Sequence, residues 1–164
     1  MKANTYDIKF TRITRFLLGD QSPRLFTQLV FYISLPVVFW YLMFFSFTLV
    51  AMRMVDALPN ANQVHEGIVR LGDMYSVSDM QGAFLRMSVI GLVSTGLMIA
   101  GILFLWRRWK IAYSLILPGI VGCLFCPWIF FGSEYFSREQ SSWEWALPST
   151  LCILVIIDWA TRGK

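Results

Sequence analysis

Charged residues are scarce in this chain, since only 15% of its 164 residues are Asp, Glu, Lys or Arg. A soluble domain carries about 25%. Histidine occurs once, at His65, which excludes haem ligation by a pair of histidines, and there is no H-E-x-x-H zinc motif. Serines in the apolar stretches, such as Ser88 and Ser94, have no base nearby to activate them as nucleophiles. We therefore expect no enzyme, no cofactor and no metal site.

Long apolar runs make up the segments that contain no charged residue. Hydrophobic residues make up 57% of the chain, and no charged residue lies between Arg24 and Arg53. A helix needs about 20 mostly apolar residues to cross the hydrocarbon of a bilayer. The sequence predicts an all-α polytopic membrane protein, with one integral membrane domain over 1–164. We expect four transmembrane helices at about 25–52, 86–106, 111–132 and 143–160.

Two further segments have the apolar spacing of amphipathic helices. The first precedes the first transmembrane helix and predicts a short helix on the cytoplasmic leaflet; its apolar positions are Tyr6, Phe10, Ile13 and Leu17. The second lies in the first outer loop and predicts a helix on the outer leaflet or on a partner protein; its apolar positions are Val64, Ile68, Leu71 and Tyr75. Both would lie along the membrane surface and not across it.

Basic residues are distributed unequally between the connections. The two terminal segments and the connection between the second and third helices hold ten of the fourteen basic residues and three of the ten acidic ones. Basic-rich segments stay cytoplasmic, so both termini should face the cytoplasm, and we expect a bacterial inner membrane protein. This topology and contact with anionic lipid explain the net charge of +4, and no nucleic-acid partner is needed.

Three cysteines are candidates for chemistry. Cys123 and Cys126 form a C-x-x-C, the spacing of thiol redox pairs, and Cys152 lies at a similar depth in the fourth helix. Four-helix membrane thiol oxidases relay electrons from such a pair to a second pair in an outer loop. The outer loops here contain no cysteine. The thiols are therefore interpreted as small hydrophobic side chains, with redox chemistry as the alternative.

Asp158 is the residue that the sequence singles out most clearly. A carboxylate at membrane depth is costly and often functional. Arg162 lies four residues further on, one helical turn away, and Arg107 and Arg108 lie in the adjacent connection. We expect a structural ion pair with one of these arginines. A proton or ion pathway is the alternative.

Small residues predict which helices come together, because they let backbones approach closely in lipid. The second helix offers the pair Gly96 and Ala100, and the third offers Gly119 and Gly122. The first helix has almost none. This pattern predicts that the second, third and fourth helices associate, while the first faces lipid or another subunit.

These features favour a non-catalytic accessory or assembly subunit of a larger membrane complex, such as a secretion, conjugation or energy-transducing machine. Its partners would be the lipid bilayer and other membrane subunits. One alternative is an immunity or exclusion factor, because the layout of four helices with both termini inside is similar to that of the immunity proteins for pore-forming colicins. Others are a homo-oligomeric channel or holin-like pore, and a thiol redox protein.

Overall fold

The computed structural model describes residues 24–139 and 142–161. Over these ranges the chain forms five α-helices and one 3-10 turn, with no strand. In chain order the elements are α2 (Leu25–Met54), η1 (Val55–Ala57), α3 (Ala61–Tyr75), α4 (Met80–Trp106), α5 (Ile111–Glu139) and α6 (Ser142–Thr161). The all-α prediction is confirmed. The amphipathic helix expected near the N-terminus lies outside the described residues.

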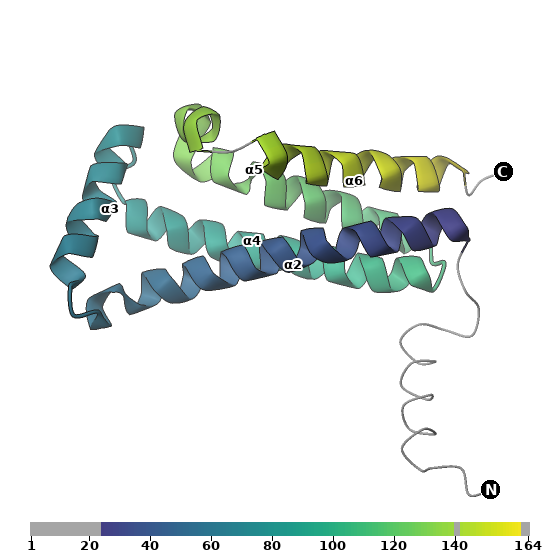
Figure 1. The fold of residues 1–164 in the computed structure, drawn as a ribbon, viewed down its shortest axis with the longest axis horizontal. Coiled ribbons are helices and arrows are strands. Elements are labelled where there is room, and N and C mark those ends of the chain that lie inside the picture. The colour runs from purple at the N-terminus through teal and green to yellow at the C-terminus, as the bar shows by residue number, and fades with distance from the viewer. Residues whose placement is uncertain (1–23, 140–141, 162–164) are drawn as a thin grey trace, which may run out of the picture.

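The helices α2, α4, α5 and α6 run side by side along the long axis, and α3 crosses one end of them (Figure 1). Each of the four is long and apolar enough to cross a membrane. Contacts run from α2 to α4, from α4 to α5, from α5 to α6 and from α6 back to α2, which closes a four-helix bundle. The interface between α4 and α5 is the most extensive, and α6 is the most lightly attached of the four long helices.

Helix α4 begins six residues before the predicted position 86, because charge was a poor guide to where the helix starts. Asp79 caps it by accepting a hydrogen bond from the Gly82 amide at 2.8 Å. The Asp79 carboxylate also pairs with the Arg86 guanidinium at 3.2 Å, so Arg86 sits within the helix and not before it. Helix α5 continues past 132, but Gly132 kinks it with a φ of 78°, a conformation that glycine adopts without strain.

The expected separation of the first helix from the others is wrong. Helix α2 contacts α4 extensively, although it offers few small residues. The small partner is on α4 instead: a Cβ at Gly91 would clash with the Phe45 ring, so the buried ring fits against bare backbone. The predicted pair at Gly96 is also wrong, because nothing lies within 4 Å of a Cβ there.

Close contact between α4 and α5 depends on Gly101 and on Gly119, which the sequence pointed to as a small contact residue. A Cβ at Gly101 would lie 2.9 Å from the Ile116 backbone nitrogen, and one at Gly119 would lie 2.8 Å from the Ser94 carbonyl oxygen. Both positions therefore need a residue without a side chain. Glycines from both helices thus allow the two backbones to approach, as is typical of close helix contacts in membranes.

Candidate functional site

A buried polar cluster joins three helices at one end of the bundle. Asp158 in the last turn of α6 is 2% exposed. Its Oδ1 accepts a hydrogen bond from the Thr27 hydroxyl of α2 at 2.8 Å, and its Oδ2 accepts one from the Tyr113 hydroxyl of α5 at 2.7 Å. We call these three residues the Asp158 cluster. Each carboxylate oxygen thus fixes the position of a different helix relative to α6.

Asp158 meets the beginning of two helices at this end of the bundle. Thr27 is the third residue of α2 and Tyr113 is the third residue of α5. Asp158 itself lies in the last turn of α6, where the helix dipole opposes a negative charge. The two hydroxyl donors therefore offset part of the cost of removing the carboxylate from water.

A second polar contact ties α2 to α6 at the same end. The Arg24 guanidinium donates a hydrogen bond to the Thr161 carbonyl oxygen at 3.4 Å. The Thr161 hydroxyl donates to the Ile157 carbonyl oxygen at 2.8 Å. The last carbonyls of a helix have no partner within the helix, so Arg24 supplies one from a neighbouring helix. The beginning of α2 and the end of α6 are therefore joined at two points, Asp158 and Thr161.

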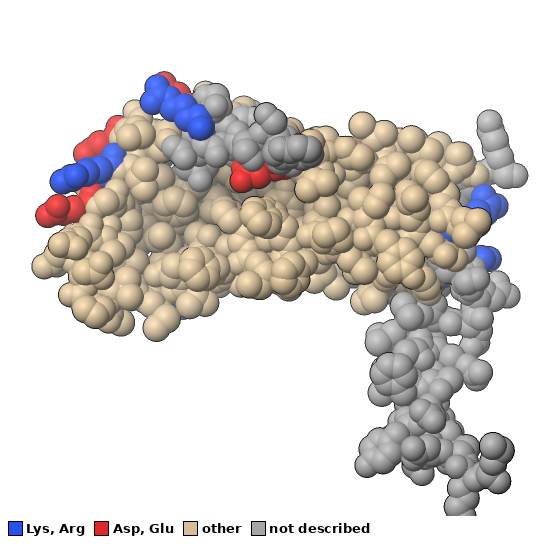
Figure 2. Space-filling view, in the orientation of Figure 1, with Lys and Arg blue, Asp and Glu red and all other residues tan. Residues whose placement is uncertain are grey.

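Basic side chains surround this end of the bundle. Figure 2 shows Lys and Arg side chains at the end where α2 begins, acidic and basic side chains together at the opposite end, and uncharged atoms over most of the length between. The short connection from α4 to α5 contributes Arg107, Arg108 and Lys110. The Arg107 guanidinium lies 5.6 Å from the Trp109 ring centroid, within the range of a cation–π contact.

The sequence pointed to Asp158 but not to its hydroxyl partners. Arg162, one of the three arginines expected as an ion-pair partner of Asp158, lies outside the described residues. Thr27 and Tyr113 are separated from Asp158 by 131 and 45 positions. The available signal was topological, because both residues lie at the start of helices that should begin at the same membrane face as Asp158. Hydroxyl side chains are common in apolar helices, so the signal alone is weak.

The C-x-x-C cysteines occupy the interface between α5 and α4, where both are 1% exposed. The Cys126 thiol donates to the Met87 carbonyl oxygen at 3.3 Å, and the Cys123 sulfur lies 3.5 Å from the Thr95 hydroxyl oxygen. Cys152 is partly buried on α6, and all three thiols are free. An exchanging thiol must be reached by its partner. This geometry therefore favours the interpretation as packing residues.

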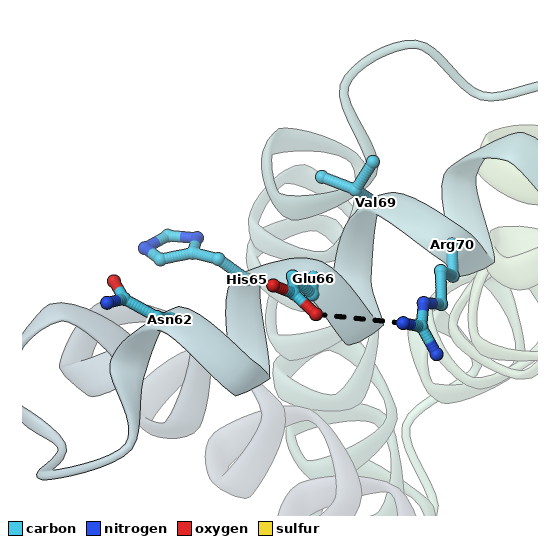
Figure 3. A pocket seen from close by; sticks show the side chains of 5 residues that line it. All are labelled: Asn62, His65, Glu66, Val69 and Arg70. Carbon is cyan, nitrogen blue, oxygen red and sulfur yellow. Dashed lines mark ion pairs between the residues drawn. The ribbon is translucent and has the colours of Figure 1, made fainter.

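Helix α3 carries a shallow hollow lined by four residues with polar side chains and one valine (Figure 3). Its lining residues all belong to this one helix: Asn62, His65, Glu66, Val69 and Arg70. Glu66 and Arg70 pair across one helical turn at 3.6 Å, and His65 Nε2 lies 2.9 Å from the Asp56 Oδ1 in η1. Both pairs are largely exposed, and exposed pairs contribute little to stability. The hollow is open surface with no buried polar group in it.

The predicted apolar face of α3 lies partly against its own bundle. Ile68 and Tyr75 are buried and Val64 is half-buried, while Leu71 is exposed. The helix contacts η1, α4 and α5. The spacing alone could not distinguish contact within the chain from contact with lipid or a partner, and the contact with the outer leaflet stays a prediction.

Comparisons with known proteins place this chain in no family. The sequence matches no protein-family model and no curated protein, and the structure matches no solved structure. Within 24–139 and 142–161, no three His, Cys, Asp or Glu residues are grouped so that they could hold a metal ion. The function must therefore be argued from the bundle itself.

Proposed function

We propose that this chain is an integral membrane protein of the bacterial inner membrane that acts as a non-catalytic accessory or assembly subunit of a larger membrane complex. Its four long helices cross the bilayer, and both termini face the cytoplasm. Secretion, conjugation and energy-transducing machines are the classes of complex that we expect. The supporting observation is the way in which α6 is held in the bundle.

Helix α6 is the least apolar and the least buried of the four long helices. It touches α2 and α5 but has few contacts with α4. Its outward face consists of large apolar side chains that are 43–59% exposed: Leu147, Ile153, Ile156, Ile157 and Trp159. A helix that is only just apolar enough to cross a membrane is stabilised when another protein covers it. Helix association in membranes depends on side-chain contacts and interhelical hydrogen bonds.

The Asp158 cluster supports this proposal because it fixes only one end of α6. The two hydroxyl bonds and the Arg24 contact lie in the last turn, within four residues of the end of the helix. Toward its beginning, α6 packs against the bundle through apolar side chains, such as the fully buried Leu151 and the ring of Trp145, whose centroid lies 6.1 Å from that of Phe125. A helix anchored at one end with an open apolar face is suited to receiving a partner helix.

The direct test is a pull-down of the full chain, tagged at its C-terminus and extracted in mild detergent, followed by mass spectrometry and native sizing. We expect a stoichiometric set of other membrane proteins. A clean monomer would contradict the proposal and favour an immunity or exclusion factor. A homo-oligomer would contradict it as well and would favour a pore, which conductance measurements would then test.

A matched pair of variants locates the binding face. The double variant Ile153→Ala and Ile156→Ala trims the outward face of α6, and we expect it to lose the partners. The double variant Ile90→Ala and Val93→Ala makes the same kind of change on the exposed face of α4, and we expect it to keep them. Equal loss in both variants would argue against α6 as the binding face.

A further inference from the structure

A groove between α2 and α4 combines an apolar floor with two guanidinium groups. It encloses about 290 Å³ and is lined by Leu49, Arg53, Leu85, Arg86, Val89, Ile90 and Phe130. This volume is just below the range for small-molecule sites, about 300–1,000 Å³. The five apolar residues suit hydrocarbon, and the two arginines suit an anion. We call this feature the Arg53 groove.

The two arginines of the groove differ in whether another side chain already pairs with them. The Arg86 guanidinium already pairs with Asp79 at 3.2 Å and donates to the Gly82 carbonyl oxygen at 3.1 Å. Asp79 therefore orients Arg86 and offsets its charge. Arg53 is exposed and forms no ion pair or hydrogen bond with any other described residue. It supplies the uncompensated positive charge of the groove.

The spacing along α4 puts the groove at the level of lipid headgroups. Arg86 and Arg107 are 21 residues apart in and just beyond α4, so they are separated by about 32 Å along the helix axis. The hydrocarbon core of a bilayer is about 30 Å thick. If Arg107 lies at the cytoplasmic face, Arg86 reaches the outer headgroups, and Val89 and Ile90 lie one turn deeper, where acyl chains begin.

We propose that the Arg53 groove binds one anionic phospholipid of the outer leaflet. Its phosphate contacts the Arg53 and Arg86 guanidinium groups, and the upper part of one acyl chain lies against Val89, Ile90 and Phe130. Charge complementarity selects the headgroup, because a zwitterionic lipid brings its own cation to the same place. The inference rests on the membrane insertion proposed above but is independent of the accessory role.

The test is a titration of the detergent-solubilised full chain with phosphatidylglycerol or phosphatidylcholine of identical acyl chains, with bound lipid counted by native mass spectrometry. We expect one phosphatidylglycerol to bind about fivefold more tightly than phosphatidylcholine, since one arginine near a membrane surface contributes about 1 kcal/mol. Arg53→Gln should abolish this preference. Arg70→Gln removes an equal charge from α3, at an arginine already paired with Glu66, and should retain the preference.

A steric pair tests the apolar half of the site. Val89→Trp fills the groove and should weaken binding of both lipids, while Val93→Trp makes the same change one turn along the exposed face of α4, outside the lining. Equal binding of the two lipids by the unaltered chain, or equal effects within either matched pair, would overturn the proposal. If the pull-down still recovers partners in that case, only the lipid site fails.

Discussion

The Asp158 cluster and the C-x-x-C pair both bury polar atoms between helices, but they join the bundle in different ways. The cluster links side chains from three helices, so each bond spans a helix boundary. The thiol of Cys126 donates to a backbone carbonyl oxygen of α4, in an interface where glycines elsewhere along the two helices let the backbones approach. The contrast shows that burial alone does not indicate importance. What matters is whether the helices would stay together without the polar contact.

The largest effect is expected when the hydrogen-bond acceptor of the Asp158 cluster, the carboxylate, is removed. Asp158→Ala leaves the Thr27 and Tyr113 hydroxyls buried without their partner, and an orphaned buried group costs about 1–3 kcal/mol. We expect the free energy of unfolding to fall by about 2–4 kcal/mol, measured by titration with a denaturing detergent. Tyr113→Phe, which removes one donor, should cost roughly half as much. Equal stability of Asp158→Ala and the unaltered chain would refute the structural role of the cluster.

The second change targets the close approach of the α4 and α5 backbones, in the same interface that holds the thiols. Gly101→Ala adds a Cβ 2.9 Å from the Ile116 backbone nitrogen and 3.0 Å from the Ala112 carbonyl oxygen, so α4 and α5 must separate slightly. Overpacking of this kind costs about 1–3 kcal/mol. Gly96→Ala is the matched control, because nothing lies within 4 Å of its Cβ. It should be neutral or slightly stabilising, and the same titration measures both variants.

The smallest effect is expected at the C-x-x-C pair. Cys126→Ala removes a weak donor and one sulfur atom from an interface that the glycines maintain, so we expect a loss below about 1 kcal/mol. Partner recovery in the pull-down should be unchanged. Loss of partners with normal stability would instead revive the redox alternative, and Cys152→Ala, at a partly buried thiol, provides the comparison.

The sequence predicted where the long helices lie along the chain, but it did not predict which face of each helix contacts its neighbours. The bounds of the four long helices lie within a few residues of the predicted ones, with two exceptions. Helix α4 starts earlier, at the residue after Asp79, which caps it, and helix α5 continues past the kink at Gly132 to Glu139. Gly91 and Gly101 make close contacts, whereas Gly96 makes none. The pattern could not distinguish these glycines, because α4 is apolar on all sides and has no polar stripe to indicate its rotation.

The sequence by itself determined that this chain forms long apolar helices, where they lie, and that Asp158 is exceptional among their residues. Those properties follow from local composition, since about 20 apolar residues suffice for one span whatever surrounds them. Only the tertiary structure decided that Thr27 and Tyr113 meet Asp158, that Phe45 fits against Gly91, and that the thiols face α4. These contacts depend on the rotation of each helix about its axis, and in helices that are apolar all round this rotation is set by their neighbours.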